Sequence, residues 1–347
     1  MFAPPATYVG PFLAFVRAGH AGVDLFFVLS AFLLSLPFLA EIRGGPVVSR
    51  RNYFLRRGLR LVPLYYTLLL LGILINVRHL RDLLPLWPYA FFLPIAHPAL
   101  EPVSTVWWSL NTEWQFYVIL PLLALVTRGS GGQRRGAIVL GVYSAAYVAF
   151  LAGLLAAPSI GAQFTLIFSL FGRGSLFLWG ILAAWIYRTH GTTIRDALAA
   201  RSWLSRGGAD AVLLALFIAM ARLLQWATID RDAWDNVPDQ GWHVIEGALW
   251  AAMVLVVLLA PLNLKAVVVN PLLGKLGEIS YSIYMWHQTI IAVALSVLAP
   301  WHVGGLGWDT RAFTAAALIS LACVGVSQLS YTVIERPFLV RKTRLAP

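Results

Sequence analysis

The sequence predicts an all-α, polytopic helical membrane protein, and the prediction rests on its composition and its apolar runs. Of the 347 residues, 59% are hydrophobic and only 12% are charged, whereas a soluble protein has about 25% charged residues. Long apolar runs recur from one end of the chain to the other, and no soluble domain of useful size fits between them. The lone cysteine, Cys323, lies in one of these runs, which excludes a disulfide framework and a cysteine metal site.

Nine apolar segments approach the roughly 20 residues that a helix needs to cross a bilayer. We expect these nine spans at residues 21–40, 61–77, 107–127, 136–157, 163–187, 210–227, 244–262, 279–299 and 312–334. The stretch Leu83–Ile95 is also apolar, but three prolines interrupt it. We therefore interpret it as an outer-face or re-entrant segment.

The placement of the basic residues indicates a membrane rather than a nucleic-acid partner, although the net charge is +11. Nineteen of the 26 basic residues fall in one set of alternate loops and five in the other. The positive-inside rule places the first set, and with it the C-terminus, in the cytoplasm. The acidic loop then faces outside, with Asp230, Asp232, Asp235 and Asp239.

The same order leaves the N-terminus outside, where residues 1–20 form a poorly defined remnant. This segment contains three prolines and Arg17, so it is a poor span, and it lacks the basic start of a signal peptide. We expect that the gene encodes one more helix upstream of Met1.

Asp24 places a carboxylate at the start of the first apolar helix, in the stretch GVDLFFVLSAF. An ionisable side chain in a span is usually aimed at a partner or a polar cavity. The functional interpretation is a carboxylate that orients a catalytic group or binds a substrate hydroxyl. The alternative is an N-cap or first-turn acid that the helix dipole stabilises.

Three arginines precede the second span within little more than one helical turn: Arg56, Arg57 and Arg60. Guanidinium groups bind phosphate bidentately, so this cluster suits the phosphates of coenzyme A on the cytoplasmic side. The alternative is ordinary anchoring to lipid head groups.

The segment WWSLNTEWQFY opens the third span and carries Trp108, Ser109 and Glu113. Ser109 and Glu113 are four residues apart and share a helix face. The tryptophans are typical of an interfacial belt, but an acid inside a span is a functional candidate.

Two further segments place polar side chains inside apolar runs. In GEISYSIYMWH, Ser280, Tyr284 and His287 follow a helical spacing, and His287 is either a general base or proton relay or a neutral hydrogen-bonding residue between helices. Arg173 interrupts the fifth span in FGRGS, where a guanidinium requires an anion or a wet cavity. The loop histidines show no ligand spacing, so we expect no metal site: His20, His79, His97 and His302.

Together these segments resemble the acyltransferase-3 family of integral membrane O-acyltransferases. The resemblance rests on GVDLFFVLSAF, on Arg57 and Arg60 with Pro63, on WWSLNTEWQFYVILP, FGRGSLFLWGILAA, LGKLGEISYSIYMWH and SYTVIERPF, in that order. It covers nearly the whole chain and implies a single domain over residues 1–347. The family has ten helices with both ends in the cytoplasm, and it moves acyl groups from coenzyme A donors to hydroxyls, commonly on sugars.

The resemblance also implies roles for the residues singled out above. We assign catalysis to Asp24, Glu113 and His287, and binding of substrate or donor to Arg57, Arg60, Arg173, Ser109, Trp108, Tyr281 and Tyr284. The family's first helix carries an arginine followed eleven positions later by a histidine thought essential for catalysis. Here Arg17 and His20 are three apart, a departure that agrees with an additional upstream helix or with lost catalysis.

The leading hypothesis is an enzyme of a bacterial-type cytoplasmic membrane. It moves an acetyl or similar group from acyl-CoA to a hydroxyl of a carbohydrate or cell-envelope glycan, and it binds no cofactor beyond this donor. Its partners are then acyl-CoA, the carbohydrate acceptor and membrane lipids, with no nucleic acid. A transporter or glycan export component is the alternative, and a catalytically inactive relative is a third reading.

Overall fold

The part of the chain that the structure describes folds entirely into helices and connecting segments. The computed structural model describes residues 18–19, 21–93, 100–152, 160–227, 240–298 and 310–342. Arg17, His20 and the four acids of the loop before residue 240 lie outside the described residues. The prediction of an all-α fold is confirmed for the described part.

Six of the nine predicted spans correspond to helices that are long and apolar enough to cross a membrane. These six helical segments are Ala21–Ile42, Arg50–Asn76, Thr165–Ala199, Leu204–Gln225, Trp242–Leu259 and Phe313–Arg341. The structure thus supports an integral membrane protein, with six such helices among the residues that it describes.

The other three predicted spans are helical, but they do not reach the same apolar character. They correspond to α5 (Trp108–Thr127), α6 (Gly132–Leu151) and α13 (Ser280–Leu298). The first two turns of α5 contain Asn111, Glu113 and Gln115, and the first turn of α6 contains Arg134 and Arg135. These polar residues lower the mean hydropathy of α5 and α6. The count of nine spans is not confirmed.

The chain divides into two compact units. The first contains residues 1–8, 49–110 and 269–347, and the second contains residues 9–48 and 111–268. These units are defined by contacts within the fold, whereas we predicted one sequence domain over the whole chain. That prediction stays a prediction.

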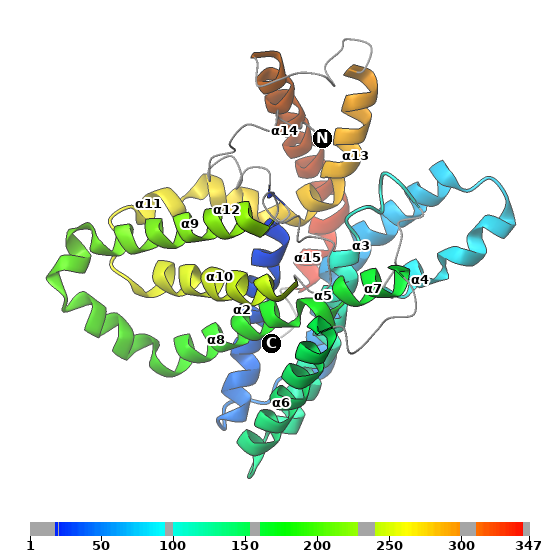
Figure 1. Ribbon diagram of the computed structural model, residues 1–347. Coiled ribbons are helices and arrows are strands. Elements are labelled where there is room, and N and C mark those ends of the chain that lie inside the picture. Colours follow the sequence, from blue (N-terminus) through cyan, green and yellow to red (C-terminus); the bar gives the residue numbers. More distant parts are fainter. Residues whose placement is uncertain are drawn as a thin grey trace. The chain divides into compact units, whose positions relative to one another are not determined.

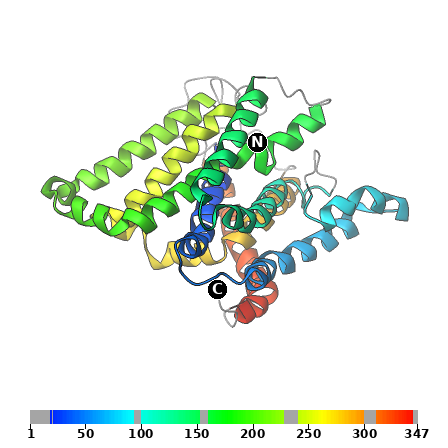
Figure 2. The same ribbon diagram turned by 90° about the horizontal axis from the view of Figure 1, so that it is seen from below.

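The core of the second unit is built from three helices: α2 (Ala21–Ile42), α8 (Leu170–Ala199) and α10 (Trp242–Leu259). Helix α9 (Ala209–Gln225) lies beside α10, and Figures 1 and 2 show α8, α9 and α10 side by side.

Two glycines allow these helices to approach closely. A Cβ at Gly180 would lie 2.3 Å from the carbonyl oxygen of Val28, and a Cβ at Gly247 would lie 2.8 Å from Trp179 Cδ1. Small residues at such crossings are a common device for packing helices in membranes.

A break separates α8 from the short helix α7 (Ile160–Ile167) that precedes it. Side chains of α5 meet the backbone at this break: the Thr112 hydroxyl donates to Phe168 O at 2.6 Å, and Gln115 Oε1 accepts from Leu170 N at 2.9 Å. The Ser169 hydroxyl caps α8 by accepting from Phe171 N at 3.2 Å. The polar first half of α5 thus satisfies backbone groups that the break would leave unpaired.

The first unit is organised around α3 (Arg50–Asn76), whose buried face carries Leu61, Leu64 and Tyr65. The Tyr65 ring lies 4.9 Å from Trp107 and 4.2 Å from Phe92. Its hydroxyl donates to the carbonyl of Tyr89, in α4 (Trp87–Ala90), at 2.7 Å. The remaining described elements of this unit are η1 (Leu80–Leu86), α12 (Pro271–Glu278), α13, α14 (Thr310–Ser330), η7 (Tyr331–Glu335) and α15 (Arg336–Lys342).

The segment 83–95, which we predicted to be an outer-face or re-entrant stretch, begins in η1 and continues through α4. Both elements are short, and neither is among the six helices that could cross a membrane. Its last two residues, Pro94 and Ile95, lie outside the described part.

We expect Gly180→Ala to destabilise the protein by about 1–3 kcal/mol, the usual cost of overpacking, because the new Cβ would lie 2.3 Å from Val28 O. Gly191→Ala on the same helix is the matched control, since its Cβ would make an ordinary contact of 3.6 Å with Leu259. Thermal unfolding in detergent measures both changes. Equal melting temperatures for the two variants would contradict the proposed tight crossing.

Candidate functional site

The second unit buries four ionisable side chains that come from three helices. Asp24 lies in the first turn of α2, Arg173 in the first turn of α8, and His243 and Glu246 at the start of α10. All four are fully buried. Ionisable groups inside membrane helices are costly and usually functional, so this charged cluster is the leading candidate for a site.

His243 connects the two carboxylates of the charged cluster. Its Nδ1 lies 2.8 Å from Glu246 Oε2 and 3.8 Å from Asp24 Oδ2. The indole of Trp250 donates to the other Glu246 oxygen at 3.3 Å. Glu246 is thus fixed by Trp250 and orients the imidazole of His243.

Arg173 supplies the positive charge of the cluster and interacts electrostatically with both carboxylates. Its guanidinium lies 5.4 Å from the centre of the Phe168 ring, and Phe168 is the residue whose carbonyl accepts from Thr112. The break before α8 therefore sets the position of the Phe168 ring, over which this arginine lies.

Asp24, His243 and Glu246 also form a set of possible metal ligands, since one donor atom from each lies within 4.8 Å of the others. The same three side chains, with Arg173 close enough to interact electrostatically with both carboxylates, also have the composition of an acid–base cluster.

The buried carboxylate of Glu113 is held by two hydroxyl groups. Ser30 on α2 donates to Glu113 Oε1 at 2.8 Å, and Tyr117, one turn along α5, donates to the same oxygen. Between Asp24 and Ser30, α2 carries Phe27, whose ring stacks on Phe177 at 4.8 Å. Phe177 stacks in turn on Phe116 at 4.4 Å. Asp24 and Ser30 are six residues apart, a rise of about 9 Å along α2, so the contact with Glu113 lies further along α2 than the cluster.

The first unit holds a second polar group, which joins the start of α5 to α13. Ser109 Oγ lies 2.6 Å from the Tyr284 hydroxyl, which also lies within hydrogen-bonding distance (2.7 Å) of Val106 O. His287 Nδ1 lies 2.6 Å from the Tyr284 carbonyl, so Nδ1 carries a proton and Nε2 is the proton acceptor. This geometry suits the predicted general base and equally the alternative of a structural hydrogen bond.

The remaining predicted site residues also lie in the first unit. Tyr281 donates from its hydroxyl to Leu61 O at 2.9 Å, and its ring lies 5.9 Å from the Arg60 guanidinium. Arg57 and Arg60 are half-buried on α3, and Trp108 is half-buried as the first residue of α5. Tyr281 therefore has a structural role in addition to the predicted one, because it ties α13 to α3.

The structure brings together some predicted residues and adds others that sequence reasoning missed. Asp24 and Arg173 interact in the charged cluster, while Glu113 occupies a separate network in the same unit. His287 belongs to the first unit, so its convergence with these residues stays a prediction. His243 and Glu246 were missed, although Glu246 lies inside the predicted span 244–262 and the two are three residues apart on one helix face.

The structure places Asp24 in the first turn of α2, where the helix dipole favours an acid. Its carboxylate also lies beside His243. Both interpretations of Asp24, as a first-turn acid and as a member of a polar site, therefore stay predictions.

Comparison with known proteins identifies the family. The model of the acyltransferase domain family named Acyl_transf_3 matches residues 1–331. No solved structure matches the chain.

Similar proteins include enzymes of O-acetylation. "Peptidoglycan O-acetyltransferase OatA" of Listeria monocytogenes serovar 1/2a is 23% identical over 356 residues, which is 93% of this chain and 52% of that protein. "Putative O-acetyltransferase" of Staphylococcus aureus (strain COL) is 23% identical over 359 residues, 93% of this chain and 53% of that protein. "Putative acetyltransferase" of Acidianus two-tailed virus is 25% identical over 279 residues, with coverages of 79% and 74%.

The chain spans about half the length of the bacterial relatives named here. The family model, in contrast, covers nearly all of the chain. Together with the long apolar helices and the buried charged cluster, this match shows that the chain belongs to the acyltransferase-3 family of membrane acyltransferases.

Proposed function

We propose that the protein is a membrane O-acyltransferase that moves an acetyl or similar acyl group from acyl-CoA to a hydroxyl of a carbohydrate or cell-envelope glycan. Family membership supports the transferase class, and the relatives named for O-acetylation support the choice of a hydroxyl acceptor. The observation that carries the proposal is the charged cluster, in which an oriented histidine, two carboxylates and a guanidinium are buried together.

The chemistry needs a base for the hydroxyl and positive charge for the carbonyl oxygen. A histidine takes the hydroxyl proton as the oxygen attacks the thioester carbonyl, so that a carbon–oxygen bond forms. The carbon–sulfur bond then breaks, and the departing thiolate takes the proton back from the imidazolium. Arg173 is the group we assign to stabilising the negative carbonyl oxygen, and Asp24 and Glu113 hold and orient the reacting groups.

Arg57 and Arg60 are the residues we assign to the phosphates of the donor. They lie three positions apart on one face of α3, and guanidinium groups pair with phosphate through two parallel hydrogen bonds. The excess of basic residues in one set of loops supports a bacterial-type cytoplasmic membrane with this end of α3 and the C-terminus in the cytoplasm, where acyl-CoA is available.

The transporter reading loses support because the family is one of transferases. An inactive relative is distinguished from an enzyme only by assay. The acyl group and the acceptor are best sought first among acetyl-CoA and peptidoglycan fragments, since OatA of Listeria monocytogenes is named for peptidoglycan O-acetylation.

Membranes that contain the protein should release coenzyme A thiol from acetyl-CoA when a glycan acceptor is added, as measured with a thiol reagent. We expect Arg57→Gln and Arg60→Gln each to raise the KM for acetyl-CoA about tenfold with kcat little changed, since loss of a charge-assisted hydrogen bond costs about 1.5–3 kcal/mol. Arg134→Gln, an exposed arginine on α6, is the matched control. Absence of acceptor-stimulated release with every glycan tested would favour a transporter or an inactive relative.

Two histidines are candidates for the base, and single variants separate them. We expect His287→Gln, the change at the predicted base, to lower kcat about 10²–10⁴-fold, the usual contribution of general-base catalysis. His243→Gln should lower kcat by a similar factor only if the charged cluster supplies the base. The measurement is kcat and KM for both variants, with circular dichroism to check folding. Full kcat in both variants would refute histidine base catalysis.

A further inference from the structure

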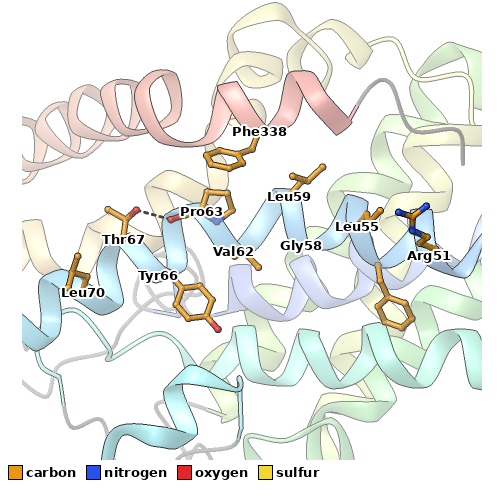
Figure 3. Close-up of a pocket in the computed structure, with 11 residues that line it drawn as sticks. Arg51, Leu55, Gly58, Leu59, Val62, Pro63, Tyr66, Thr67, Leu70 and Phe338 are labelled. Carbon is orange, nitrogen blue, oxygen red and sulfur yellow. Dashed lines mark hydrogen bonds between the residues drawn. The ribbon is translucent and has the colours of Figure 1, made fainter. Parts of the chain in front are cut away.

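One face of α3 forms an open groove with a single cation at one end (Figure 3). The groove has a volume of about 830 Å³, within the range of roughly 300–1,000 Å³ typical of ligand sites. Its lining residues are Arg51, Phe54, Leu55, Gly58, Leu59, Val62, Pro63, Tyr66, Thr67 and Leu70 of α3, with Phe338 of α15 on the other side. All belong to the first unit.

The helical spacing of these residues makes the groove long and straight. Arg51, Leu55, Leu59, Val62, Tyr66 and Leu70 recur at intervals of three and four positions, so they follow one face of the helix. From Arg51 to Leu70 the helix rises about 29 Å. An occupant that fills this length is a long chain rather than a compact metabolite.

Gly58 supplies the depth of the groove near its centre. A Cβ at this position would meet only Val62 Cγ2, at 3.9 Å. The missing side chain therefore leaves space between Leu55 and Val62, and a larger residue would fill that space without displacing the backbone.

The lining offers an occupant one charged contact and otherwise apolar surface. The Tyr66 hydroxyl donates to Ala90 O at 2.6 Å, and the Thr67 hydroxyl donates to Pro63 O at 2.8 Å. Both hydroxyls are thus engaged within the protein. Arg51 is exposed, and no carboxylate pairs with it in the part of the chain that the structure describes.

We propose that this groove on α3 binds a single anionic glycerophospholipid, with its phosphate on Arg51 and one acyl chain along the face from Leu55 to Leu70. A guanidinium matches the geometry of a phosphate, and a chain anchored at one end fits a groove with one charged end. The site is separate from the assignment of Arg57 and Arg60 and does not depend on the proposed enzymatic reaction.

Native mass spectrometry of the full chain, purified in mild detergent and titrated with palmitoyl-oleoyl-phosphatidylglycerol, tests the site. We expect the wild type to retain one lipid at least tenfold more tightly than any further lipid. Arg51→Gln removes the cation and Gly58→Leu fills the groove, and each should weaken that first binding event at least tenfold. Gly58→Ala should have an intermediate effect.

Two variants with the same chemical changes elsewhere are the controls. Arg134→Gln removes an exposed arginine on α6, and Gly325→Leu adds a side chain at an exposed position of α14 with nothing within 4 Å of its Cβ. Both should keep the first lipid, and circular dichroism and size-exclusion chromatography should show folding like that of the wild type.

Competition and stoichiometry distinguish the other possible occupants. Excess glycerol phosphate should not displace the lipid, because it lacks the chain, and displacement would reduce the site to a phosphate contact. Equal lipid retention by wild type and Gly58→Leu would overturn the proposal. So would a wild-type dimer that separates into monomers in Gly58→Leu, which would assign the groove to a second copy of the chain.

Discussion

Mutual neutralisation is the condition on which the second unit depends. The four side chains of the charged cluster are fully buried: Asp24, Arg173, His243 and Glu246. Each of them alone among apolar helices would destabilise the fold, because an unpaired buried charge costs several kcal/mol. Close approach of α2, α8 and α10 makes the pairing possible, and that approach depends on Gly180 and Gly247. The packing and the charged cluster therefore stabilise one another.

In the first unit, hydrogen bonds from tyrosines fix how the helices pack against one another. Lipid tails are as apolar as leucine side chains, so burial alone gives little preference for one helix contact over another in a bilayer. Tyr65 and Tyr281 each donate to a backbone carbonyl of another segment, and Ser282 donates to the buried Glu335. Such contacts give the helices a defined register that apolar packing would leave open.

Much of the fold and part of the site follow from the sequence. Apolar runs of about 20 residues fix the helical class, and Asp24, Glu113 and Arg173 were singled out because polar residues inside such runs are conspicuous. The partners of these residues could not be predicted, because helical periodicity shows which face is polar and not which helix meets it. Thus Ser30 and Tyr117 were not foreseen as partners of Glu113, nor His243 as a neighbour of Asp24. The count of nine spans is not confirmed: six helices in the described part of the chain are long and apolar enough to cross a membrane, and polar residues near the starts of α5 and α6 reduce the hydropathy of those two helices.

The break before α8 has a mechanical consequence. Thr112 and Gln115 replace backbone hydrogen bonds at Phe168 and Leu170, so the bend is maintained by another helix rather than by proline. A rotation or sliding of α5 would therefore displace the backbone of Phe168. Since Arg173 lies over the Phe168 ring, such a movement of the helix that carries Glu113 would also change the surroundings of the guanidinium.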